Sequence, residues 1–269
     1  MNVILRTWFQ TGLGDFYACL LSTKIGYDFL KTKGYNVKVI ISYESSHYGM
    51  DLQTNLLNEC FDLTVFDNIG LNEKIPDNFK FCHNIDYAYE IYTVNDDICS
   101  EIDRSNLHGY SVESIFGGTP YPSEYYRDNL VLFKSNFIDE VKNIVSNYGR
   151  FLTIFYRFPD SHTLNENDIL DFTNKIKSIS KENEGLNIFM SCKIQQVLDI
   201  FTGDDRFLKL EYNVSSNYER VKRDLINMCI LMYSEKIYYR IYHWSNYLTL
   251  SFVHNKSEKK YNNFLIRIF

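Results

Sequence analysis

The sequence predicts an α/β protein of two domains, each built on a parallel β-sheet, with the two sheets facing a central cleft. Short apolar segments, rich in β-branched and aromatic residues, alternate with longer segments of helical periodicity along nearly the whole chain. This alternation stops and restarts around residues 117–122, where glycines and prolines are typical of a linker. We therefore predict one domain at residues 1–122 and a second at residues 123–269.

In the first domain, apolar runs and the turns between them define the predicted elements. Residues 3–7 are an apolar run ended by turn residues, and the helical segment at 16–33 ends at Gly34, the usual position of a C-cap glycine. The order strand, helix, strand, helix, strand implies a parallel sheet with right-handed crossovers. The predicted strands are 3–7, 37–41, 63–66 and 79–81, and the predicted helices are 16–33, 51–60 and 98–116.

The second domain repeats the alternation of strands and helices. Residues 151–156 are apolar or β-branched throughout, which is typical of a central strand of a parallel sheet. Asn165 is the expected N-cap of the helix that follows. The predicted strands are 130–133, 151–156, 187–190, 207–210 and 236–241, and the predicted helices are 138–148, 165–181, 193–201, 217–233 and 244–253.

Composition excludes several classes of function. The net charge of −6 offers no broad basic surface for nucleic acid, so no nucleic-acid partner is expected. The cysteines form no C-x-x-C pair and lie in apolar surroundings, which indicates reduced thiols and a cytoplasmic protein. The histidines and cysteines lack zinc-site spacing, and the chain contains no Asp-x-Asp triplet that would present two carboxylates to a divalent metal. We therefore expect no metal and no resident cofactor.

A glycine turn, Gly12-Leu13-Gly14-Asp15, lies between the first predicted strand and the first helix. The N-terminus of a helix carries unpaired N–H donors and a positive dipole, so Gly12 and Gly14 are candidates for an anion-binding turn. Tyr17 stands where a dinucleotide fingerprint needs its third glycine, and no Gly-Lys-Ser/Thr of a P-loop follows. Asp15 places a carboxylate at this turn, and a plain helix cap remains its structural alternative.

Polar and charged residues follow several predicted strands, where an open α/β sheet binds its ligands. Arg157 follows the strand at 151–156, and its planar guanidinium can bind a diphosphate through two hydrogen bonds. A salt bridge to Asp160 or to another carboxylate is the structural alternative, and both interpretations stay open. Lys193 and Ser245 also suit a solvated helix start and a helix cap. The candidates for nucleotide or phosphate binding are Ser191, Lys193, Glu211, His243, Ser245 and Asn246.

These motifs resemble those of two glycosyltransferase families with the GT-B fold, which consists of two Rossmann-like domains. The turn from Gly12 to Asp15 resembles the Gly-x-Gly-Asp turn of the heptosyltransferase family, whose aspartate is taken as the base that activates the acceptor. Arg157 and Ser245 resemble the fucosyltransferase-like branch, which has His-x-Arg after a second-domain strand and a serine at a later helix start. Phe155 occupies the histidine position, so the motif is half present.

The resemblance implies a glycosyltransferase that moves a sugar from a nucleoside diphosphate-sugar to a hydroxyl acceptor, without a metal and with inversion. It implies an acceptor-side first domain, with Asp15 as base, and a donor-binding second domain, with Arg157 at the departing diphosphate. Residues 262–269 are then expected to return to the first domain. Two alternatives remain: an inactive relative that binds a nucleotide or glycan, and a structural α/β protein without a small ligand.

The C-terminal tail mixes basic and apolar residues. Lys256, Lys259, Lys260 and Arg267 alternate with the apolar residues of 264–269, a composition that can hold a protein at an anionic membrane surface. A last strand or helix that packs onto the fold is the interpretation we favour. Any membrane association is therefore expected to be peripheral.

Overall fold

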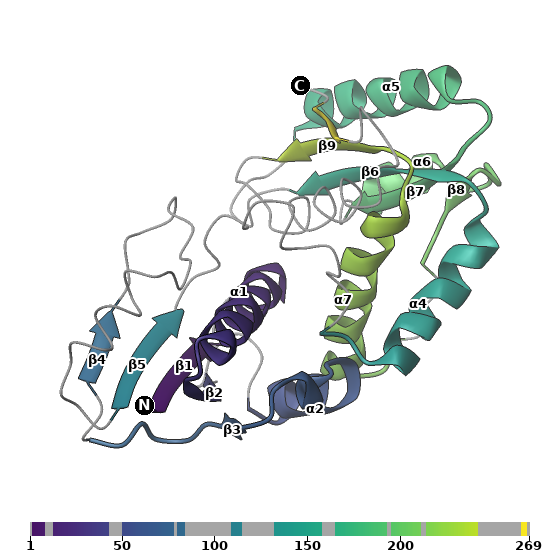
Figure 1. Cartoon of the computed structure of the whole chain (residues 1–269). Coiled ribbons are helices and arrows are strands. Elements are labelled where there is room, and N and C mark those ends of the chain that lie inside the picture. The colour runs from purple at the N-terminus through teal and green to yellow at the C-terminus, as the bar shows by residue number, and fades with distance from the viewer. Residues whose placement is uncertain are drawn as a thin grey trace. The chain divides into compact units, whose positions relative to one another are not determined.

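The computed structural model shows two compact units, residues 1–138 and residues 139–269 (Figure 1). The predicted boundary between residues 122 and 123 lies outside the described residues, and the two units divide after Ile138. The described residues are 2–8, 13–42, 50–77, 80–83, 109–114, 132–157, 165–192, 195–210, 214–241 and 265–267.

The first unit is built on a five-stranded sheet whose paired strands are all parallel. Its described elements are β1 (Asn2–Trp8), α1 (Leu13–Thr32), β2 (Asn36–Ser42), α2 (Met50–Cys60), the 3₁₀ helix η1 (Leu63–Val65), β3 (Ile69–Leu71), β4 (Lys80–His83) and β5 (Gly109–Ser114). The strand order is β3-β2-β1-β5-β4, and α1 packs against β1 and β2. The predicted parallel sheet is therefore confirmed, and β4 confirms the short strand expected near residue 80.

Helix α1 ends as the glycine pattern predicts. Gly34 adopts φ 85°, a left-handed conformation that a residue without Cβ reaches at little cost. The N–H of Gly34 donates to the carbonyl of Lys31, and the N–H of Tyr35 donates to the carbonyl of Leu30. These two bonds form a Schellman motif, and the buried side chains of Tyr35 and Leu30 occupy its two hydrophobic positions.

Aromatic rings form the core beside α1. The ring of Tyr17 stacks on Phe133 at 4.4 Å between centroids, and Phe16 meets Phe61 edge-on at 5.5 Å. The backbones of Phe61 and Phe133 form a single antiparallel bridge. The strand predicted at 130–133, as the start of the second domain, is therefore wrong for its described residues. Phe133 belongs to the first unit because its ring is buried among these aromatics.

Local hydrogen bonds and long-range pairing overturn two more predicted elements. Residues 63–65 form η1 rather than a strand, because the Asp62 carboxylate accepts a bond from the Thr64 N–H and caps a helical turn. The strand comes later, as β3. The helix predicted at 98–116 is wrong over its described part, since residues 109–114 form β5 and pair with β1. Pairing with a central strand outweighs helical periodicity there.

The second unit is a second five-stranded parallel sheet, with order β10-β9-β6-β7-β8. Its elements are α4 (Ser135–Tyr148, which begins in the first unit), β6 (Phe151–Arg157), α5 (Glu166–Glu182), β7 (Asn187–Cys192), α6 (Gln195–Ile200), β8 (Phe207–Leu208), α7 (Asn217–Tyr233), β9 (Ile237–Ile241) and β10 (Leu265–Arg267). Numbered within the unit, this is the Rossmann order 3-2-1-4-5. β10 pairs with β9, so the expected return of the last stretch to the first domain is wrong for these residues.

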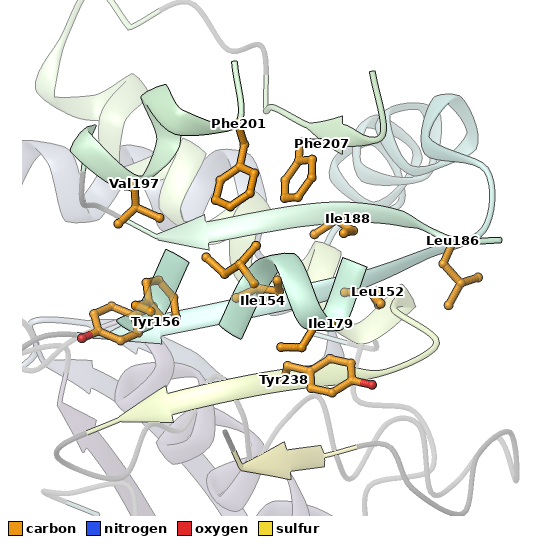
Figure 2. Packing of buried hydrophobic residues seen from close by; sticks show 12 residues of the cluster. Leu152, Ile154, Tyr156, Ile179, Leu186, Ile188, Val197, Phe201, Phe207 and Tyr238 are labelled. Carbon is orange, nitrogen blue, oxygen red and sulfur yellow. The ribbon is translucent and has the colours of Figure 1, made fainter. Parts of the chain in front are cut away.

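Helices cover both faces of the second sheet. On one face, Ile154 of β6 and Ile188 of β7 pack with Ile179 of α5 and with the stacked rings of Phe201 and Phe207 (Figure 2). On the other face, the ring of Tyr148, the last residue of α4, contacts Phe151 and Phe189. β6 is consequently buried on both faces, as expected of a central parallel strand.

Helices α5 and α7 both begin with a capping box. The side chain of Asn165 accepts a bond from the Asp168 N–H, which confirms the predicted cap, and the Asp168 carboxylate accepts from the Asn165 N–H. Ser216 and Glu219 make the same reciprocal pair at α7. Hydrogen bonds from Ser215 and then from Ser216 lower the pKa of Glu219 below 4.5. Each of these helix N-termini is thus closed by its own carboxylate.

Gly34→Ala should lower the free energy of unfolding by about 1 kcal/mol, because the added Cβ disfavours the left-handed backbone. Gly34→Asn should lose less, since asparagine tolerates this conformation. Gly185→Ala is the control: its new Cβ meets nothing within 4 Å, and its φ lies outside the left-handed range. Urea denaturation of the three variants measures the effect, and equal stability of Gly34→Ala and wild type would contradict it.

Glu219→Gln should make the melting temperature depend less on pH in the acid range. A carboxylate with a lowered pKa stabilises the folded state above its ordinary pKa of 4.5, and this contribution disappears as pH falls through the folded pKa. Wild type should therefore lose more thermal stability between about pH 5 and about pH 3 than the variant does. The exposed Glu184→Gln serves as a control of the same charge change. Parallel melting-temperature curves for wild type and Glu219→Gln would count against this role.

Candidate functional site

The second sheet has a topological switch point between β6 and β9. From β6 the chain moves through β7 to β8 on one side, and it later adds β9 and β10 on the other side. Parallel pairing brings all these carboxyl ends to one edge, with Arg157 opposite Ile241 and Tyr156 opposite Arg240. Open α/β sheets bind ligands outside the carboxyl ends at such a point. We call this edge the β6/β9 edge.

The strand ends at the β6/β9 edge are positively charged. Among the last three residues of β6, β7, β9 and β10 there are arginines and no Asp or Glu. The arginines are Arg157, Arg240 and Arg267. A local excess of three positive charges stands against a whole chain of net charge −6, so this edge suits an anionic ligand.

Arg240 is a residue that the sequence reasoning missed. Its guanidinium carbon lies 5.6 Å from the centroid of the Tyr156 ring, within cation–π range. The Tyr156 ring is in turn 4.1 Å from the ring of Phe172 on α5, and Tyr156 is buried. Arg240 was included in the predicted strand at 236–241. A charged residue one place before the end of an apolar strand is the signal that could have identified it.

The N-termini of α5 and α7 do not offer the anion site. The carboxylates of Asp168 and Glu219 already occupy the first turns of α5 and α7 as capping groups. The negative charge of these carboxylates would repel a bound phosphate, and N–H groups that could donate to the phosphate already donate to the capping side chains. The cations among the last residues of β6, β9 and β10 are arginines.

The first sheet has its own switch point between β1 and β5. α1 begins shortly after β1, and Gly14 and Asp15 are its second and third residues, with Gly14 buried. The backbone of Asp15 thus lies inside the first turn of α1, whereas the sequence pattern predicts Gly14 and Asp15 in a turn before a helix that starts at Phe16. Gly12 lies outside the described residues.

Charge at the ends of the first sheet is balanced rather than positive. Arg6 lies beside Glu113 in the register of β1 and β5, and its Nε donates to the Ser42 hydroxyl at 2.7 Å. Ser42 is buried, and Thr7 next to Arg6 is buried as well. By residue type, the last three residues of β1 and of β5 carry no net charge, which suits an anion less well than the arginines of the β6/β9 edge. The two sheets therefore differ in the ligand charge that they favour.

The structure places two of the predicted second-domain site residues at this edge, Arg157 and Ser191. Arg157 is the last residue of β6, and Ser191 is the half-buried penultimate residue of β7, in register with Phe155. Phe155 itself is buried, so the position that resembles a histidine of the fucosyltransferase-like motif is part of the core. The remaining predicted residues lie outside the described residues: Lys193, Glu211, His243, Ser245 and Asn246.

A cavity of about 650 Å³ lies away from this edge, between the end of α5 and the turn after α6. Lys177 and Lys181 line it together with Phe201 and Arg206. Arg206 is held by the Ser180 side chain and carbonyl, so its guanidinium already has protein partners. Because strand topology directs ligands to the carboxyl ends, we assign the functional site to the β6/β9 edge rather than to this cavity.

The described residues contain neither a cluster of metal ligands nor a membrane-spanning helix. No group of three or more His, Cys, Asp or Glu side chains in this part of the chain is placed to hold a metal ion. No described helix combines the length and the apolar character needed to cross a bilayer.

Comparison with solved structures finds the same fold in the α-1,6-fucosyltransferase NodZ. The NodZ structure soaked with GDP-fucose has a TM-score of 0.58 and 14% identity, over 94% of this chain and 92% of that chain. A selenomethionine NodZ structure from Bradyrhizobium has a TM-score of 0.60 and 14% identity, over 93% and 91%. NodZ co-crystallised with GDP has a TM-score of 0.59 and 14% identity, over 93% and 92%.

No protein-family model matches the sequence, and no curated protein matches it either. At 14% identity the likeness to NodZ is one of fold. It confirms the predicted fold class, because the chain shares the two Rossmann-like α/β units of a GT-B fucosyltransferase structure.

Proposed function

We propose that this protein is a glycosyltransferase that moves a sugar from a nucleoside diphosphate-sugar to a hydroxyl group of an acceptor. The observation that carries the proposal is the set of arginines at the switch point of a Rossmann-ordered sheet. A diphosphate is the charged part common to such donors, and arginine binds it with paired hydrogen bonds. Support comes from solved structures of the same fold that were soaked with GDP-fucose or co-crystallised with GDP.

In this proposal the second unit binds the donor and the first binds the acceptor. Negative charge grows on the diphosphate as the bond to the sugar breaks, and a fixed cation at Arg157 stabilises it in the transition state. Arginines can supply the positive charge that a divalent ion supplies in other sugar transfers, so we propose a metal-independent reaction. Lys193, Glu211, His243, Ser245 and Asn246 follow the same strands, and we assign them to donor binding.

Asp15 is the proposed general base. The acceptor hydroxyl attacks the anomeric carbon, the bond from that carbon to the diphosphate oxygen breaks, and the hydroxyl proton passes to the carboxylate. A single displacement of this kind inverts the anomeric configuration. Gly14, the second residue of α1, has no side chain, which lets a ligand approach the start of the helix next to Asp15.

A second candidate is an inactive relative that binds a nucleotide or glycan without turning it over. The buried Phe155 favours it, because an apolar core residue stands where the resembling motif has a histidine. Thermal-shift measurements with GDP-, UDP-, ADP- and CMP-sugars, followed by turnover assays, separate the possibilities. Stabilisation with turnover supports the transferase, stabilisation without turnover supports the inactive relative, and no stabilisation indicates a structural protein.

Asp15→Asn should lower kcat by about 10²- to 10⁴-fold, the usual contribution of general acid–base catalysis. Nucleotide affinity should change little, because the carboxylate acts on the acceptor. Asparagine has nearly the same shape as aspartate, so the variant removes the carboxylate and little else. Because Asp15 is the third residue of α1 and not its N-cap, a variant with wild-type turnover would show that Asp15 is not the base.

Arg157→Ala should weaken the binding of nucleoside diphosphates and slow turnover. The same guanidinium would bind the diphosphate of the bound nucleotide and stabilise its negative charge in the transition state. Arg150→Ala is the matched control, because Arg150 precedes the amino end of the same strand and pairs with Glu235 at 2.6 Å. Calorimetric titration with GDP, UDP and ADP measures the affinities. If both variants lost the same affinity for the diphosphates, the loss would come from the change in total charge and not from the position of Arg157.

A further inference from the structure

We propose that the cavity between the end of α5 and the turn after α6 binds a small organic monoanion, a carboxylate with an apolar body. We call it the α5/α6 cavity. Its lining combines an apolar floor with cations, and its volume of about 650 Å³ falls in the usual range of small-molecule sites. The cavity lies away from the β6/β9 edge, so the inference goes beyond the proposed function and does not depend on it.

The order of the elements places the α5/α6 cavity at the amino ends of the strands. α5 ends at Glu182, shortly before β7 starts, and α6 is followed by a turn that leads into β8. Near the start of β7, Ile188 is in register with Phe207 of β8, and its N–H donates to the carbonyl of Arg206 at 2.7 Å. Because the strands are parallel, their starts lie at the edge opposite the β6/β9 edge. A ligand in the α5/α6 cavity would therefore leave the β6/β9 edge open.

Two stacked rings form the apolar floor of the cavity. The rings of Phe201 and Phe207 lie 4.3 Å apart between centroids, and each residue is 8% exposed (Figure 2). Ile200, which precedes Phe201, is 48% exposed and lines the same cavity. An apolar ligand body would cover Ile200 and the exposed parts of the rings, and removal of this surface from water favours binding.

Two lysines of α5 stand beside this floor. Lys177 and Lys181 are exposed, and a spacing of four residues puts them on one face of the helix. Neither belongs to an ion pair among the described residues. Five other described lysines do have carboxylate partners: Lys24, Lys31, Lys38, Lys74 and Lys222. The ammonium groups of Lys177 and Lys181 can therefore both turn to one anionic group in the cavity.

Arg206 is the third cation of the lining, and the end of α5 holds it in place. Its Nη1 donates to the carbonyl of Ser180 at 3.2 Å, and its Nη2 donates to the hydroxyl of Ser180. The Asp204 carboxylate lies 3.7 Å from its Nε. A guanidinium has five N–H donors, so these described contacts use one of the two donors on each Nη. Arg206 thus adds a fixed positive charge to the wall of the cavity.

The charges of the lining favour a single negative charge on the ligand. Three cations line the cavity together with two carboxylates, Glu184 and Asp204, so the lining has a net charge of +1. A carboxylate matches this charge, whereas a phosphate monoester carries about −1.5 to −2 and exceeds it. The C-terminal end of α5 carries a partial negative charge, which disfavours a dianion further. The same lysines offset the charge of this helix end, so binding and stability have to be measured separately.

The test is calorimetric titration of the full chain with 2-naphthoate, with the neutral 2-naphthalenemethanol and with 2-naphthyl phosphate. Wild type should bind 2-naphthoate at one site and more tightly than either analogue. The double variant Lys177→Gln/Lys181→Gln should raise the Kd for 2-naphthoate by about 2- to 25-fold, since one exposed ion pair contributes about 1.5- to 5-fold. The control is Lys142→Gln/Lys175→Gln, which removes two exposed lysines that do not line the cavity.

Glu184→Gln should change the affinity in the opposite direction. It removes a carboxylate from the lining, so the Kd for 2-naphthoate should fall by about 1.5- to 5-fold, a gain that damage to the fold would not produce. Ile200→Ser removes exposed apolar surface and should weaken the binding of 2-naphthoate and 2-naphthalenemethanol alike. These two variants decide the matter if the double lysine variant does not fold.

The inference is overturned if wild type does not bind 2-naphthoate, or binds the neutral alcohol equally well. Equal losses in the two double lysine variants would overturn it too. A lower melting temperature of Lys177→Gln/Lys181→Gln with an unchanged Kd would show that these lysines only stabilise the helix end, and the inference would fail. Displacement of 2-naphthoate by GDP would place it at the β6/β9 edge and have the same consequence. If wild type binds 2-naphthoate as expected but no nucleotide, the inference stands and the proposed function fails.

Discussion

The parallel pairing of β6 with β7 on one side and β9 on the other is the interaction on which the second unit depends. It buries Ile154 and Tyr156 on one face of the strand and Phe151 and Phe155 on the other. Thr153 is buried as well, and its hydroxyl forms a hydrogen bond with the buried hydroxyl of Ser234, so these two groups satisfy each other. Because the strands are parallel, this core also brings all of their carboxyl ends to one edge.

Strand order then decides which strand ends can share a ligand. β6 is the strand from which the chain extends the sheet first to one side, through β7 and β8, and later to the other side, through β9 and β10. Residues 157 and 240 are far apart in sequence but lie at the ends of adjacent strands. The site is therefore a product of topology, and the same residues in another strand order would be separated.

Charge distinguishes the two units, although both are parallel sheets of five strands. The register of the first sheet pairs Arg6 with Glu113, whereas the last three residues of β6, β7, β9 and β10 include three arginines and no Asp or Glu. Helix dipoles do not alter this contrast, because α5 and α7 satisfy their own N-termini with capping carboxylates. Under the proposed function, arginine side chains of the second unit would bind the diphosphate, in a protein whose net charge is −6.

The sequence by itself determined the fold class, most helices and strands, the Gly34 and Asn165 caps and the placement of Arg157 at a strand end. Each depends on local chemistry: apolar periodicity, a glycine that tolerates positive φ, and a side chain that bonds a nearby N–H. The tertiary structure decided what depends on partners distant in sequence. Pairing with β1 made residues 109–114 a strand, and aromatic packing assigned Phe133 to the first unit. Likewise, only the register of β9 against β6 set Arg240 over Tyr156, because no local pattern encodes which strands become neighbours.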